Sequence, residues 1–112
     1  MAETETGKTY QVHGRVMGKH GRAVHRAKVV VWWQHIRFRR QLAVGETNRD
    51  GYYRLRYPIP EHFPGKVLIV VGASSMELGR PLESDLVEAQ PVLCLDLARG
   101  GALLRVLASN PT

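Results

Sequence analysis

Apolar and polar residues alternate with a period of two along much of the chain, which is the pattern of β-strands that bury one face. Residues 52–57 show it most clearly, because tyrosine or leucine alternates there with arginine. Residues 28–36 are the most apolar stretch, and their β-branched and aromatic side chains are typical of a central strand. No longer run has a convincing helical period. The pattern therefore predicts an all-β protein.

Turn signals separate these strands. The strongest is Asp50-Gly51, because glycine takes positive φ freely and aspartate tolerates it. This turn lies between the apolar segments 42–47 and 52–57, so the sequence predicts a β-hairpin at the centre of the chain. About seven short strands, with turn signals every 8–12 residues, predict a two-sheet antiparallel sandwich. The other strands are expected at residues 9–16, 28–36, 66–73 and 91–98. The segment 85–90 fits either a strand or a single helical turn, and the segment 102–108 fits either a strand or a helix.

The size of the chain, 112 residues, is that of one domain with a core of its own. We expect a single β-sandwich domain over residues 9–108, a flexible leader over 1–8 and a frayed tail over 109–112. The leader is polar and acidic, so it does not resemble a signal peptide, and no apolar run is long enough to cross a bilayer. A cytoplasmic location is the default expectation, and export by a route without a cleaved signal stays open.

Charge and reactive residues narrow the classes of function. The formal net charge of +6 suits an acidic protein surface or a nucleic acid as the partner. Cys94 is the only cysteine, which excludes an intramolecular disulfide and a cysteine-rich metal site. No two of the five histidines are two residues apart, and the Gly-x-Ser-x-Gly motif of serine hydrolases is absent. The sequence thus predicts no catalytic residue, no metal ligand and no cofactor.

Two consecutive tryptophans and the basic segment that follows them are the candidate partner-binding site. Neighbours on a strand face opposite ways, so one tryptophan packs between the sheets and the other lies on the outer face. Three interpretations stay open: a protein-docking patch, because Trp and Arg are enriched at binding hot spots; a stacking platform for single-stranded nucleic acid; or a basic hairpin tip whose phenylalanine folds back onto the sandwich. The candidate residues are Trp32, Trp33, Arg37, Phe38, Arg39 and Arg40.

The spacing of several small motifs resembles a known family. The motifs are Gly14-Arg15-Val16, Gly21, Ala27-Lys28-Val29, Gly45 and Asp50-Gly51-Tyr52-Tyr53. In this order they are similar to the transthyretin-like, carboxypeptidase-regulatory-like β-sandwich, over residues 10–73. The resemblance implies that Ala27 and Val29 face inward and that Tyr53 fills the space between the sheets.

The branches of this fold imply different functions. The 5-hydroxyisourate hydrolases end in Tyr-Arg-Gly-Ser, which residues 107–112 lack, and the intradiol ring-cleaving dioxygenases hold ferric iron with two tyrosines and a His-x-His pair, which is also missing. Residues 42–57 are most similar to sandwiches of bacterial toxin-complex and contractile secretion-spike proteins. We therefore expect a non-catalytic protein-binding or structural adaptor module with a protein partner inside such an assembly. The alternatives are a hydrolase of the 5-hydroxyisourate hydrolase type and a nucleic-acid-binding domain that uses its basic face.

Overall fold

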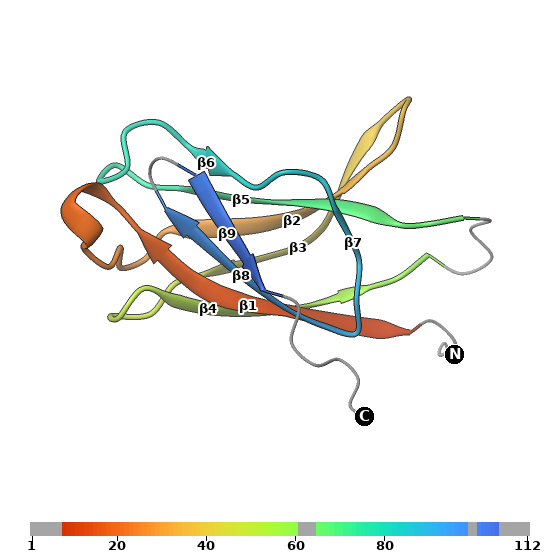
Figure 1. The fold of residues 1–112 in the computed structure, drawn as a ribbon, viewed down its shortest axis with the longest axis horizontal. Helices are drawn as coiled ribbons and strands as arrows, with labels where there is room; N and C mark the ends of the chain where they lie inside the picture. Colours follow the sequence, from red (N-terminus) through yellow and green to blue (C-terminus); the bar gives the residue numbers. More distant parts are fainter. Residues whose placement is uncertain (1–7, 61–64, 99–100, 106–112) are drawn as a thin grey trace.

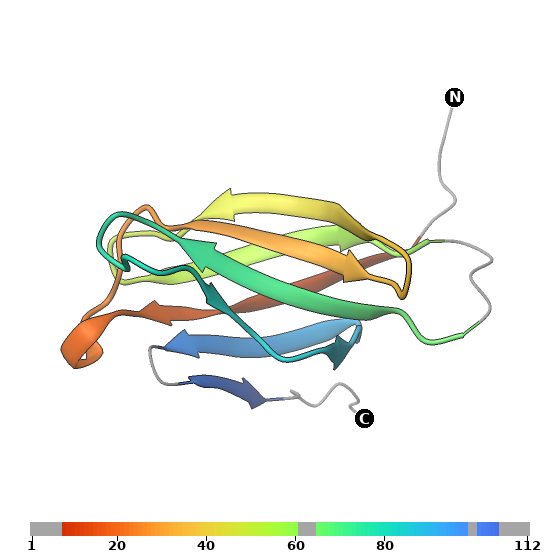
Figure 2. The ribbon, with the colours of Figure 1, turned by 90° about the horizontal axis from the view of Figure 1, so that it is seen from above.

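A computed structural model describes residues 8–60, 65–98 and 101–105 of the chain, the last of these as backbone only. These residues form two β-sheets that pack face to face (Figure 1 and Figure 2). One sheet has the strand order β4-β1-β8-β9, and the other has the order β3-β2-β5-β6, with β7 also paired to β5. The elements are β1 (Thr9–Met17), the 3₁₀ helix η1 (Lys19–Gly21), β2 (Lys28–Gln34), β3 (Arg39–Glu46), β4 (Tyr52–Pro58), β5 (Leu68–Ser74), β6 (Leu82–Glu83), β7 (Val87–Glu88), β8 (Val92–Ala98) and β9 (Gly101–Arg105).

The core lies between the two sheets and is built from alternate residues of the strands. Ala27 and Val29 are fully buried and Tyr53 is 4% exposed, so all three lie where the sequence places them. The all-β, two-sheet sandwich is confirmed. Burying one Val, Leu or Ile side chain contributes about 1.5–3 kcal/mol, so this layer is the main source of stability. Its other large members are Val12, Val16, Val31, Leu55, Tyr57, Ile69, Val71, Leu93, Leu95 and Leu97.

The predicted central hairpin is wrong, although its turn is present. The two segments around Asp50-Gly51 are β3 and β4, but β3 pairs with β2 while β4 pairs with β1 in the opposite sheet. The turn therefore carries the chain from one sheet to the other. The packing of the two strands gives the reason. The backbone of Gly45 in β3 faces inward, and Leu55 of β4 packs directly over it. A Cβ added at Gly45 would lie 2.5 Å from Leu55 Cδ2.

Polar contacts fix this crossing. Gly51 has φ of +83° and is buried against Val16, so a side chain there would be strained and would meet the Val16 carbonyl oxygen. The carboxamide of Asn48 accepts hydrogen bonds from two backbone N–H groups of the turn. The buried Thr47 hydroxyl donates to the Val24 carbonyl and accepts from the Ala27 N–H at 2.9 Å. The crossing is thereby tied to the segment that joins β1 and β2.

The pairing of β1 with β8 is parallel, so the expectation of purely antiparallel sheets is wrong at this pair. The ladder is interrupted at Gly14 and Arg15. Leu95 there offers its carbonyl oxygen to the hydroxyl of Tyr53, 2.6 Å away, and Arg15 N–H donates to the Asp96 carboxylate at 2.9 Å. Burial, and to a smaller extent the Asp96 charge, raises the pKa of Tyr53.

The strand predictions at both ends of the chain are tested only in part. Residues 1–7 and 106–112 lie outside the described residues, so the leader and the tail stay predictions. Of the two ambiguous segments, 85–90 contains the strand β7, and residues 102–105, the described part of 102–108, belong to the strand β9. Within the described part of the chain, no helix is long and apolar enough to cross a membrane.

Candidate partner-binding surface

The β2–β3 hairpin extends away from the two sheets (Figure 1). The register between its strands shifts after the pair Val31–Ala43, and the next pair is Trp32–Gln41. The extra residue, Leu42, makes a β-bulge, which bends a strand and increases its twist. The bend at the bulge accounts for the outward course of the hairpin.

The tip of the hairpin is short and exposes an apolar residue. His35 N–H donates to the Phe38 carbonyl at 2.8 Å, so only Ile36 and Arg37 lie beyond the last pair. Ile36 is 96% exposed and Arg37 is also exposed. The predicted loop of residues 37–41 is therefore shorter than expected, because β3 already begins at Arg39.

Aromatic rings brace this tip through contacts within the hairpin. Trp33 is 7% exposed and lies on the inward face of β2. Phe38 meets it edge to face, with ring centroids 5.1 Å apart, and stacks on His35 at 4.7 Å. The Arg40 guanidinium lies 5.9 Å from both the Trp33 and the Phe38 ring centroids. Phe38 thus folds back onto Trp33 of the same hairpin, and its ring braces the tip while 41% of its surface stays exposed.

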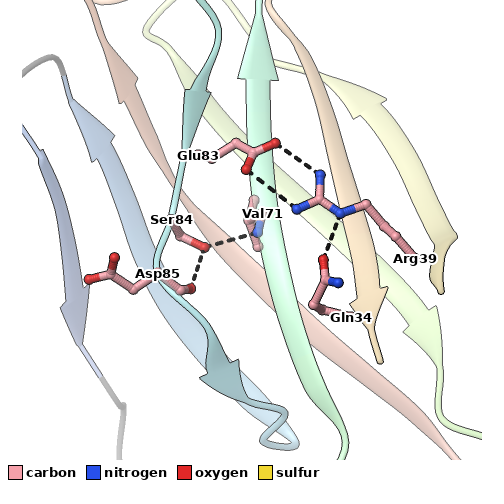
Figure 3. A network of polar contacts seen from close by, with 6 residues as sticks. All are labelled: Gln34, Arg39, Val71, Glu83, Ser84 and Asp85. Atoms are coloured by element: carbon pink, nitrogen blue, oxygen red, sulfur yellow. Dashed lines mark hydrogen bonds and ion pairs between the residues drawn. The ribbon is translucent and has the colours of Figure 1, made fainter. Parts of the chain in front are cut away.

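The other tryptophan, Trp32, belongs to a different surface. It lies half-buried on the outer face of the five-stranded sheet, with the Arg39 guanidinium 5.5 Å from its ring centroid. Arg39 donates to the Gln34 side chain at 2.7 Å and pairs with Glu83 of β6 at 3.0 Å (Figure 3). This ion pair reaches from β3 across β2 and β5 to β6, so the charge of Arg39 is already compensated.

The six predicted residues therefore fall into two groups. Trp32 and Arg39 cover the outer face of the five-stranded sheet, whereas the remaining four gather at the hairpin. The sequence interpretation missed Ile36, which it assigned to the end of a strand. The available signal was one aliphatic residue between His35 and Arg37, in a segment that must reverse direction. Among the described residues, no three His, Cys, Asp or Glu side chains are grouped so that they could hold a metal ion.

Comparisons with known proteins inform the fold. No family model matches the sequence. No curated protein matches it either. The structure is similar to a 9R-lipoxygenase from Cyanothece PCC8801, with a TM-score of 0.58 and 14% identity over 87% of this chain and 18% of that chain. It is also similar to the dioxygenase domain of a dioxygenase carbohydrate-binding protein fusion from Streptomyces sp. SirexAA-E, with a TM-score of 0.48 and 17% identity over 93% of this chain and 80% of that chain. The chain spans less than a fifth of the lipoxygenase, and that likeness shows a shared sandwich fold alone.

Proposed function

We propose that this chain is a non-catalytic protein-binding module that docks through the tip of its β2–β3 hairpin. The observation that carries the proposal is Ile36, which is 96% exposed at the end of a projecting and braced hairpin. An exposed aliphatic side chain gains free energy when a partner pocket covers it, at about 25 cal/mol per Å² of apolar surface. Arg37, beside it, suits an acidic rim around that pocket.

Bracing makes the tip an efficient ligand. Association costs free energy for every loop or side chain that must be ordered at the interface. The stack of Phe38 on His35 and the edge contact of Phe38 with Trp33 already order the hairpin in the free protein. When a partner binds, little of the binding free energy is therefore spent on ordering the hairpin.

The proposed partner is an acidic protein surface within a larger assembly. The net charge of +6 favours such a surface. The resemblance of residues 42–57 to toxin-complex and contractile secretion-spike sandwiches suggests the kind of assembly, in which this module would act as an adaptor or a structural part.

Site-specific photo-crosslinking in cells of the native host tests this function. A photoreactive phenylalanine analogue is placed at Ile36 in one variant and at Met76 in another. Met76 is 99% exposed in the β5–β6 connection, which leaves the sheet at the end opposite the hairpin, so it is a matched control. We expect one discrete crosslinked protein from position 36 that position 76 does not give.

A substitution pair completes the test. Ile36→Ser should weaken co-purification of the crosslinked protein by about tenfold or more, because a hot-spot truncation typically costs above 1–2 kcal/mol. Met76→Ser, also at a fully exposed apolar residue, should leave co-purification unchanged. Crosslinking of the same set of proteins from both positions, or equal recovery with Ile36→Ser, would remove the hairpin tip from the function.

A further inference from the structure

A second exposed surface, which differs in chemistry from the hairpin tip, lies on the outer face of β1 and β4. The register of these strands places Gln11 opposite Arg56, His13 opposite Arg54, and Arg15 opposite Tyr52. All six side chains point away from the core, because the residues between them along each strand are the buried ones. The face therefore gathers three arginines, one histidine and one tyrosine on two adjacent strands.

Two arginines on this face take no part in the ion pairs of the described residues. Arg54 and Arg56 are exposed, and within residues 8–60 and 65–98 neither guanidinium takes part in an ion pair, hydrogen bond or ring contact. Asp96 on β8 accepts the backbone N–H of Arg15, and Glu46 shares a cleft lining with Arg54 without an ion pair between them. This arrangement is the opposite of the five-stranded sheet, where Glu83 neutralises Arg39.

An aromatic ring and a cleft lie beside these arginines. Tyr52 is 51% exposed, and the Arg15 guanidinium is held 4.9 Å from its ring centroid by a hydrogen bond to the Asp50 carbonyl at 2.9 Å. Next to the ring is an open cleft of about 400 Å³. Its lining is polar and comprises His13, Glu46, Asn48, Tyr52, Tyr53 and Arg54.

We propose that this face binds a single strand of nucleic acid, independently of the docking role of the hairpin. Alternate residues on a strand are about 7 Å apart, so Arg54 and Arg56 form a cationic track along β4 for the phosphate backbone. Tyr52 is the ring on which a base stacks at the mouth of the cleft, and the base edge would meet the Glu46 carboxylate and the side-chain NH₂ group of Asn48, whose carboxamide oxygen is held by the turn. An acidic protein would use the same arginines but would have no need of the cleft beside the ring, which is why we favour nucleic acid.

The first test measures binding of fluorescently labelled oligothymidylate and oligouridylate to the purified chain by fluorescence anisotropy. Affinity should fall with salt between about 50 and about 200 mM, with a log–log slope near −0.7 for each phosphate contact. Arg54→Gln combined with Arg56→Gln should weaken binding by about tenfold or more and flatten that slope. Arg22→Gln combined with Arg80→Gln removes the same charge from exposed positions elsewhere and should change affinity by less than about threefold.

The second test separates stacking from charge. Tyr52→Ala should weaken binding by about fivefold or more, whereas Tyr52→Phe, which keeps the ring, should retain it. Far-UV circular dichroism confirms that each variant is folded, and all the substituted side chains are exposed. No saturable binding at the lowest salt, equal losses in the two arginine pairs, or competition by polyglutamate as strong as by unlabelled oligonucleotide would each overturn the proposal. The last result would instead assign the face to acidic proteins.

Discussion

The central strand pairs of the two sheets are built in different ways. In the five-stranded sheet, β2 and β5 form an unbroken antiparallel ladder from Lys28–Ser74 to Trp33–Ile69. In the four-stranded sheet, β1 and β8 run parallel, and their ladder is interrupted where Gly14 approaches Leu95. A tyrosine hydroxyl and an aspartate carboxylate satisfy the backbone groups at the interruption.

This difference shows two ways of specifying a strand pairing. The β2–β5 pairing depends on a run of β-branched side chains, and each of them can be replaced by a hydrophobic residue of similar volume at little cost. The β1–β8 pairing depends on particular atoms: the missing Cβ of Gly14 and the hydroxyl of Tyr53. We therefore expect the same kind of substitution to have unequal effects in the two sheets.

The largest expected difference is between two glycine substitutions. Gly14→Ala should lower the free energy of unfolding by about 3 kcal/mol or more, because the new Cβ would overlap the Leu95 carbonyl oxygen and force the strands apart. Gly72→Ala in β5 should change it by less than about 1 kcal/mol, since its Cβ would lie 3.5 Å from the nearest atom, Leu82 O. Urea unfolding of both variants measures this, and equal losses would contradict the contrast.

Removal of two buried hydroxyls gives the next effect. Tyr53→Phe leaves the buried Leu95 carbonyl without its 2.6 Å donor and should cost about 1–3 kcal/mol. Tyr57→Phe should be neutral or slightly stabilising, because the Tyr57 hydroxyl is buried without a hydrogen-bond partner among the described residues. Thermal unfolding of the two variants side by side is the measurement. A larger loss of stability for Tyr57→Phe than for Tyr53→Phe would show that the Tyr57 hydroxyl does make a stabilising hydrogen bond.

Alkaline pH should sharpen the same contrast. Burial raises the pKa of both Tyr53 and Tyr57, so they keep their protons in the folded state while unfolded tyrosine ionises above about pH 10. The unfolded state then binds fewer protons, and stability falls as the pH rises above about 10, by about 1.4 kcal/mol per pH unit for each such tyrosine. Tyr53→Phe should show a shallower fall than the wild type in urea unfolding at a series of alkaline pH values. Parallel curves would mean that Tyr53 ionises without unfolding.

The smallest effect is expected on the outer face of the five-stranded sheet. The Arg39–Glu83 pair is more than one-third exposed on both sides, so Arg39→Gln should cost less than about 1 kcal/mol. The emission of Trp32 should change nonetheless, because the cation above its ring is lost. A double-mutant cycle with Glu83→Gln isolates the pair. A coupling energy well above about 1 kcal/mol would show that this face contributes to stability as much as the β1–β8 pairing does.

Most strands could be predicted from the sequence, but their partners could not. The period of two in residues 52–57 correctly indicates the buried face of β4. The turn signal of Asp50-Gly51 shows where the chain reverses, yet a reversal between paired strands and a crossing between sheets use the same turn residues. The crossing depends on how Leu55 packs over Gly45, which is a contact in space that no local pattern records.

The residue types of the candidate site could be predicted from the sequence, but most of their arrangement in space could not. Alternation along β2 requires the two tryptophans to part, and Trp33 turns inward while Trp32 turns outward. The bulge at Leu42 leaves no clear mark in the sequence, although it directs the hairpin outward and so makes Ile36 prominent. In the sequence, Arg54 and Arg56 look like ordinary residues of a solvent-exposed strand face. The sequence does not reveal which arginines form ion pairs with acidic residues.

The parallel pairing of β1 with β8 also has a consequence during synthesis. Arg15 and Asp96 are 81 positions apart, so β1 leaves the ribosome roughly 4–16 s before its partner at ordinary elongation rates. Through this interval Tyr53 has no Leu95 carbonyl to bind, and one edge of β1 stays open to other strands. The nascent chain is therefore most exposed to mispairing before residue 98 emerges, whereas the β2–β3 hairpin can close as soon as it has been made.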